Sequence, residues 1–256
     1  MPSFDETHLD VNGIDAAVLT AGDGESILLL HGGGVLEGFD CFLPLAERFR
    51  LIVPHHPGFG ASAEDPRVES MQDWVRRYVA LLDIFELESV VLFGHSLGGL
   101  LAARLTIDHP ERVRRLVVAS PAGLDVPEHP LANLGQLAPG EVYALLTKDP
   151  SVFEGRIPEP LDDAFMAARM REGRSIGQVL HGPFDPVLEE SLGDVRVPTL
   201  ILWGDDDKIV PVEHGAVWAA RLPNARLRVF PGKGHLLFHE EPEAVAAVGA
   251  FAQEQP

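Results

Sequence analysis

The chain has 256 residues, 46% of them hydrophobic, so it can bury a sizeable core as one large domain or as a core with a small insertion. Its formal net charge is −19, and no cluster of Lys and Arg offsets it, which disfavours binding to nucleic-acid phosphates and to anionic membranes. Cys41 is the single cysteine, which excludes an internal disulfide, and no apolar run approaches the roughly 20 residues of a membrane helix.

Strand and helix patterns alternate through the first part of the chain. Residues 8–11 and 16–19 flank Asn12-Gly13, a dipeptide that favours a tight turn, and so predict an opening hairpin. The elements predicted after it are a strand at 27–30, a helix at 39–49, a strand at 51–54, an amphipathic helix at 70–87, a strand at 90–93, a helix at 97–108 and a strand at 113–119. This alternation predicts a mostly parallel sheet covered on both faces, with its active site at the carboxyl ends of the strands.

The alternation stops between residues 122 and 193, where repeated prolines divide the sequence into short helical pieces. Strand patterns return at Thr199 and Leu227, and a last helix is predicted at 242–251. We therefore expect a helical cap inserted between the two parts of one core. The predicted divisions are a first core part at 1–121, the cap at 122–193 and a second core part at 194–256.

Ser96 lies between glycines where a strand pattern meets a helical one, in the sequence Gly94-His95-Ser96-Leu97-Gly98. A sharp strand-to-helix turn strains the serine backbone and leaves no room for neighbouring side chains, which the two glycines lack. Upstream, a buried-strand pattern ends in His31 and a run of three glycines, whose N–H groups can point at an oxyanion. Downstream, one strand pattern ends in Asp205, Asp206 and Asp207, and the next ends at His235.

These motifs together resemble the α/β-hydrolase superfamily, in which serine, acid and histidine follow in this order along the chain. The resemblance extends from about residue 8 to about residue 252. It implies an α/β fold with a mostly parallel, doubly wound sheet and a helical cap. It also implies that Ser96 is the nucleophile and His235 its base, and that Leu97 and Gly33 supply the backbone N–H groups of the oxyanion hole.

Several aspartates compete for the acid that orients the histidine. The family pattern Trp-Gly-x-x-Asp-x-x-x-Pro favours Asp207, with Asp206 as the next choice, and Asp205 is interpreted as an exposed turn residue. Some relatives carry the acid after the preceding strand, where Asp125 could serve.

The other histidines near these motifs are interpreted as structural. We expect His95 to point away from Ser96 and to pack or bond locally, and His239 to be a surface or helix-entry residue. His55 and His56 have no carboxylate or cysteine at ligand spacing, so no metal site is assigned. Relatives usually have an aspartate where His56 stands, at the start of a loop that we expect to support the site.

A serine nucleophile favours acyl transfer to water over the alkyl-enzyme chemistry of haloalkane dehalogenases and epoxide hydrolases. We expect an esterase that acts on a small, mainly apolar carboxylic ester or lactone, because the cap holds more acids than bases and a neutral substrate is the simpler choice. The glycine run also resembles that of carbon–carbon hydrolases of meta-cleavage ring-fission products. Those usually have Trp directly after the histidine, where this chain has Leu236.

Two further functions stay open: a perhydrolase using the same triad, and a hydrolase-fold ligand receptor with slow or no turnover. No cofactor is implied, and the expected partner is a small-molecule substrate, with neither nucleic acid nor membrane. The first residues lack the basic and apolar regions of a signal peptide, so we expect a cytoplasmic protein. The oligomeric state and the identity of the substrate are left undetermined by the sequence.

Overall fold

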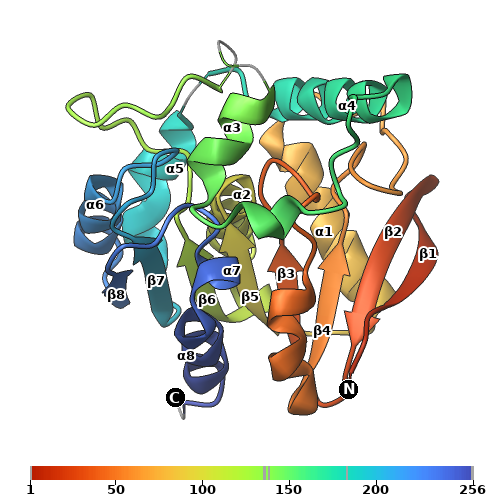
Figure 1. The fold of residues 1–256 in the computed structure, drawn as a ribbon. Coiled ribbons are helices and arrows are strands. Elements are labelled where there is room, and N and C mark those ends of the chain that lie inside the picture. Colours follow the sequence, from red (N-terminus) through yellow and green to blue (C-terminus); the bar gives the residue numbers. More distant parts are fainter. Residues whose placement is uncertain (1, 135–136, 138, 183, 255–256) are drawn as a thin grey trace.

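The computed structural model describes residues 2–134, 137, 139–182 and 184–254, so the predicted domain ends at residues 1 and 256 lie outside it. Within these residues, eight strands form one sheet in the order β1-β2-β4-β3-β5-β6-β7-β8 (Figure 1). The pairs β1·β2 and β2·β4 are antiparallel, and every other pair is parallel. The predicted mostly parallel sheet is therefore confirmed.

The strands are β1 (Asp5–Val11), β2 (Ile14–Ala21), β3 (Glu25–Leu30), β4 (Phe49–Pro54), β5 (Val90–His95), β6 (Val113–Ala119), β7 (Thr199–Gly204) and β8 (Ala225–Phe230). The helices that accompany them are η1 (Asp40–Glu47), α1 (Met71–Ile84), α2 (Leu97–Asp108), η2 (Pro110–Arg112), α6 (Glu213–Arg221), α7 (Leu237–Glu240) and α8 (Pro242–Ala252). Between β6 and β7 lie α3 (Pro139–Leu146), η4 (Pro150–Phe153), α4 (Asp163–Val179), α5 (Pro186–Ser191) and η5 (Leu192–Asp194).

Side chains of the central strands alternate between two hydrophobic cores, one on each face of the sheet. Leu28 and Leu30 belong to the core that includes Trp74 of α1, together with side chains of α2 and α6. Ile27 and Leu29 belong to the other core, with side chains of η1, α7 and α8. In Figure 1, α8 lies in front of the sheet and α1 and α2 behind it. Because both faces are covered, the central strands appear in the sequence as continuous apolar runs.

Two predicted helices differ from the observed ones, each for a local reason. The segment predicted as a helix at 39–49 forms the shorter 3-10 helix η1, which contains Pro44 and so lacks one backbone donor. The helix predicted at 70–87 ends at Ile84, and Glu86 follows with a φ of 56° that no α-helix accommodates. The opening hairpin is confirmed, since Asn12 and Gly13 have the positive φ angles of a primed turn, 58° and 83°.

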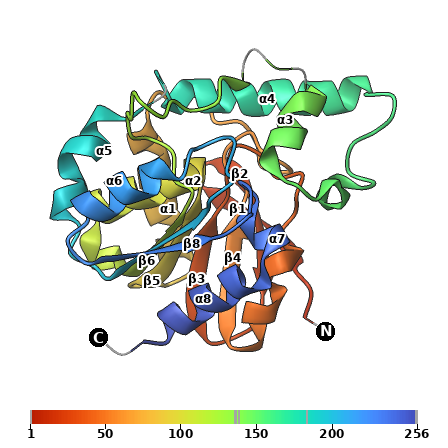
Figure 2. The same ribbon diagram turned by 60° about the vertical axis from the view of Figure 1, so that its left-hand side comes forward.

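The helices α3 and α4 lie over the carboxyl ends of the parallel strands (Figures 1 and 2). Among the described residues of 122–193, the secondary structure consists of helices, turns and one isolated bridge between Gly123 and Phe184. The helical character expected of this segment agrees with these elements. That the segment is a separate cap domain with boundaries at 122 and 193 stays a prediction.

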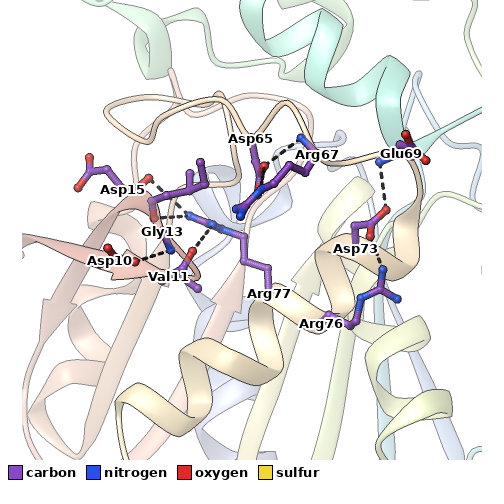
Figure 3. Close-up of polar contacts among 11 residues, drawn as sticks. Asp10, Val11, Gly13, Asp15, Asp65, Arg67, Glu69, Asp73, Arg76 and Arg77 are labelled. Carbon is purple, nitrogen blue, oxygen red and sulfur yellow. Dashed lines mark hydrogen bonds and ion pairs between the residues drawn. The ribbon is translucent and has the colours of Figure 1, made fainter.

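Arg77 of α1 ties this helix to the antiparallel edge of the sheet. Its buried guanidinium donates to the carbonyl oxygen of Val11 at 3.0 Å and reaches those of Ile14 and Asp15 at 3.4 and 3.5 Å (Figure 3). Burial lowers the pKa of Arg77 from its usual value. The preceding residue, Arg76, is exposed instead and forms an ion pair with Asp73 within the same helix.

We expect Arg77→Leu to lower the free energy of unfolding by about 1.5–3 kcal/mol, because hydrogen bonds from a charged donor contribute about this much. The matched variant Arg76→Leu removes only an exposed ion pair and should cost at most about 1 kcal/mol. Urea unfolding followed by circular dichroism measures both. Equal losses in the two variants would contradict the role of Arg77 as the anchor of the hairpin.

Candidate active site

The turn between β5 and α2 holds Ser96 in a strained conformation, with φ 53° and ψ −116°. A positive φ is uncommon for a residue with a side chain, and such strain often marks a functional position. A Cβ at Gly94 would lie 2.2 Å from the carbonyl oxygen of Gly98, and a Cβ at Gly98 would lie 2.2 Å from that of Leu30. Both positions therefore require glycine, as the sequence pattern predicts.

His235 and Asp207 form a buried pair at the carboxyl end of the sheet. Nδ1 of His235 lies 2.8 Å from Oδ2 of Asp207, and the two residues are 2% and 6% exposed. The other carboxylate oxygen accepts hydrogen bonds from the N–H groups of Ile209 and Val210, both at 2.9 Å. Burial raises the pKa of the Asp207 carboxyl, but the facing His235 and the backbone N–H groups outweigh it and hold this pKa below its usual value. The carboxylate is thus ionised and fixed in place.

The competing aspartates are engaged elsewhere. Asp206 forms an ion pair with Lys148 at 2.6 Å, and this lysine together with Lys208 lowers its pKa to about 2. Asp205 and Asp125 are exposed. Of the acids considered from the sequence, the structure brings Asp207 against the histidine.

The glycine loop after β3 approaches the serine turn closely. A Cβ at Gly32 would lie 3.4 Å from the Cβ of Ser96, and a Cβ at Gly33 would lie 3.6 Å from the side chain of Ile176 in α4. Leu97 is the first residue of α2, so its N–H is one of the donors that a helix N-terminus leaves without an intrahelical acceptor. The two predicted oxyanion donors, Gly33 and Leu97, therefore belong to the two segments that adjoin Ser96, and their role stays a prediction.

The interpretation of two other histidines is wrong in part. His95 does not bond locally: its Nε2 lies 2.9 Å from the carbonyl oxygen of His235, and the two rings are 4.7 Å apart. The chain after β8 returns to the end of β5 and creates this contact. His239 is half-buried rather than a surface residue, with its Nε2 3.7 Å from Sγ of Cys41, because α7 packs against η1.

Two charged side chains that the sequence analysis did not assign to the site lie beside it. Glu37 follows the glycine loop, and its Oε2 would lie 3.8 Å from a Cβ at Gly34. Burial raises the pKa of Glu37, while the charges of His235 and Arg169 act in the opposite direction. Arg169 of α4 forms an ion pair with Glu172 at 2.6 Å, and its buried Nε has no hydrogen-bond partner among the described residues.

No sequence signal distinguishes these two residues, because a single Glu in a loop and an Arg on an amphipathic helix usually face solvent. Within the described part of the chain, no group of three or more His, Cys, Asp or Glu side chains is arranged to hold a metal ion. The described helices are also too short or too polar to cross a membrane.

Comparisons with known proteins agree with this geometry. A family model described as the alpha/beta hydrolase family matches residues 27–248, a range that contains Ser96, Asp207 and His235. The chain is 30% identical to 2-hydroxy-6-oxo-6-(2'-aminophenyl)hexa-2,4-dienoic acid hydrolase of Metapseudomonas resinovorans, over 95% of this chain and 89% of the relative. It is 29% identical to 2-hydroxy-6-oxo-6-phenylhexa-2,4-dienoate hydrolase of Burkholderia cepacia, over 88% of this chain and 86% of the relative.

Among solved structures, a serine hydrolase involved in carbazole degradation is similar to this chain with a TM-score of 0.79 and 26% sequence identity. The similarity covers 97% of this chain and 98% of the other. The similarity therefore includes the helices over the carboxyl ends of the strands as well as the sheet itself.

Proposed function

The chain belongs to the alpha/beta hydrolase family, and on this premise we propose that it is a serine hydrolase with Ser96, His235 and Asp207 as its catalytic triad. The observation that carries the proposal is the buried 2.8 Å contact between His235 and Asp207. A serine hydroxyl is a poor nucleophile until a base takes its proton, and the base needs an acid that orients it and stabilises its charge.

In the proposed reaction, Oγ of Ser96 attacks the carbonyl carbon of the substrate while Nε2 of His235 takes the serine proton. Nε2 acts because Nδ1 is held by Asp207. Negative charge then develops on the carbonyl oxygen, where the N–H groups of Leu97 and Gly33 bind it. The bond to the leaving group breaks as His235 gives the proton to that group. Water, deprotonated by the same histidine, finally releases the acid from Ser96.

As the first candidate substrate we propose a 2-hydroxy-6-oxo-dienoate, cleaved at the carbon–carbon bond next to its ketone. The curated relatives that support this choice are named for such compounds. A carbon leaving group must have its electron pair delocalised. In these compounds the proton of the 2-hydroxy group first moves to C5, so that C2 becomes a ketone, and the electron pair of the broken C5–C6 bond then passes through C4 and C3 to the C2 oxygen. We assign the substrate carboxylate to Arg169 of α4, whose guanidinium is charged and whose buried Nε has no hydrogen-bond partner among the described residues.

A small, mainly apolar carboxylic ester or lactone is the second candidate. Two observations favour a neutral substrate. Leu236 follows His235 where carbon–carbon hydrolases usually have Trp, and Glu37 places a carboxyl beside the triad, where an ionised form would repel an anion.

One panel of substrates separates the two candidates. The purified protein is assayed with 2-hydroxy-6-oxo-6-phenylhexa-2,4-dienoate and with nitrophenyl esters of increasing acyl length. Turnover of the dienoate supports the first candidate, and ester turnover that peaks at one acyl length supports the second. Failure on both substrates, with saturable binding of the dienoate, would favour a ligand receptor instead.

We expect Arg169→Met to raise KM for the dienoate by about 10-fold or more and to leave KM for a neutral ester within about 3-fold, because a buried hydrogen bond to a charged group is lost. The ratio of kcat/KM for the two substrates is the readout, since it cancels any loss of folded protein. The control Arg174→Met removes an exposed arginine that pairs with Glu64. An unchanged ratio of kcat/KM values in Arg169→Met would show that Arg169 does not bind the substrate carboxylate.

A further inference from the structure

We propose that His56 is a positioning residue of the glycine loop, residues 32–34. It acts with Tyr78 and His31 through a network of hydrogen bonds that holds the peptide between Gly32 and Gly33. The inference rests on the proposed function and adds to it a residue that touches neither substrate nor triad.

The hydrogen bonds of His31 fix its tautomer. The backbone N–H of His56 donates to Nε2 of His31 at 2.9 Å, so this nitrogen carries no proton. Nδ1 of His31 therefore carries it and donates to the carbonyl oxygen of Gly32 at 2.8 Å.

The tautomer of His56 is fixed in the same way. Its Nε2 lies 2.9 Å from the carbonyl oxygen of His31, which can only accept, so Nε2 carries the proton. Its Nδ1 is left as an acceptor for the hydroxyl of Tyr78 in α1. The ring of His56 thus accepts from Tyr78 and donates to the main-chain carbonyl of His31. The ring of His31 accepts from the backbone of His56 and donates to the carbonyl of Gly32.

This network of hydrogen bonds acts on the oxyanion hole because of the planarity of the peptide bond. The carbonyl of Gly32 and the N–H of Gly33 belong to one peptide unit, and in a trans peptide they point in opposite directions. A hydrogen bond that holds the Gly32 carbonyl toward the ring of His31 therefore aims the Gly33 N–H away from that ring. Glycine offers little resistance to rotation of this peptide, so an external constraint is needed.

Burial among aromatic rings keeps the imidazoles of His31 and His56 neutral and restricts their orientation. His56 is fully buried, between the ring of His31 with centroids 3.8 Å apart and the ring of Trp74 at 4.7 Å. Burial lowers the pKa of His56 to about 3 and that of His31 well below its usual value. A neutral ring is required, because each ring must donate with one nitrogen and accept with the other.

An aspartate at this position could not do the same. An ionised carboxylate has no proton to donate, so it would face the carbonyl oxygen of His31 as an unpaired charge. A glutamine at position 56 keeps an N–H group at the end of its side chain that can reach this carbonyl, and a leucine has neither a donor nor an acceptor.

The test compares His56→Leu and His56→Gln with the control His214→Leu. His214 is also a buried histidine, 1% exposed, whose Nε2 lies 2.7 Å from the carbonyl oxygen of His129, away from the glycine loop. Active sites are counted by titration with a serine-directed phosphonate, so that kcat refers to folded protein. We expect His56→Leu to lower kcat by about 100-fold with KM within about 3-fold, the effect of losing one oxyanion donor.

We further expect His56→Gln to recover kcat to within about 10-fold of the wild type and His214→Leu to change it by less than about 3-fold. A kcat in His56→Leu that stays within about 3-fold of the wild type, or one that the glutamine does not recover, would overturn the proposal.

Nitrogen-15 NMR of the wild-type protein gives a second readout that needs neither a folded variant nor a substrate. We expect the proton on Nδ1 of His31 and on Nε2 of His56, and the opposite tautomer of either ring would overturn the proposal. If the wild type hydrolyses no substrate, the proposed function fails, while the two tautomers still decide whether this network of hydrogen bonds exists.

Discussion

Replacing Ser96 with alanine should lower kcat by at least about 10⁴-fold for every substrate that the protein hydrolyses, because the step that forms the acyl-enzyme is lost. The folded structure should survive. Alanine keeps the Cβ that the turn already accommodates at φ 53°, and Ser96 contributes its backbone N–H, not its hydroxyl, to the bond with the carbonyl of Ala119 at 2.9 Å. The thermal unfolding midpoint should therefore stay within a few degrees of the wild type.

Two measurements check this expectation. Steady-state hydrolysis gives kcat for the wild type and the variant, and mass spectrometry after treatment with a fluorophosphonate gives the residue that is labelled. We expect one adduct on Ser96 in the wild type and none in Ser96→Ala. An adduct on another serine, or a variant that retains more than about 1% of the activity, would exclude Ser96 as the nucleophile.

Asp207→Asn should lower kcat by about 10⁴-fold while the substrate still binds. An amide in place of the carboxylate cannot stabilise the positive charge that His235 acquires, and its NH₂ group favours a tautomer that leaves the proton on the wrong ring nitrogen. The 2.8 Å contact between Nδ1 and Oδ2 makes this effect direct.

Asp206→Asn is the matched control, because it makes the same chemical change one residue earlier. Asp206 faces Lys148 and Lys208 at the surface, so we expect its loss to change kcat by less than about 3-fold. Kinetics of both variants with the same ester or dienoate decide between the two acids. A large loss in Asp206→Asn with near-normal Asp207→Asn would reverse the assignment.

The sheet could be predicted from the sequence because its strands are covered on both faces. Runs such as 27–30 and 90–93 are apolar throughout, and Asn12-Gly13 marks the hairpin by turn chemistry alone. The ends of the helices could not be predicted equally well. The break after Ile84 depends on a single left-handed residue, Glu86, which no apolar periodicity reveals.

The candidate triad could be predicted because the residues involved are attached to strand ends in a fixed order along the chain. The groups around it depend on contacts between distant segments. Arg169 comes from α4, over the carboxyl ends of the strands, and Glu37 comes from a loop. The contact between His95 and the carbonyl of His235 also joins residues far apart in the sequence. Patterns of spacing within one segment carry no information on such contacts.

The decisive experiment measures kcat/KM for 2-hydroxy-6-oxo-6-phenylhexa-2,4-dienoate side by side for the wild type and Ser96→Ala. We expect the wild type to hydrolyse the dienoate to the two products of carbon–carbon cleavage, and kcat/KM to fall by at least about 10⁴-fold in the variant. Equal hydrolysis by both proteins would contradict a serine mechanism, and no hydrolysis by the wild type would contradict the first candidate substrate.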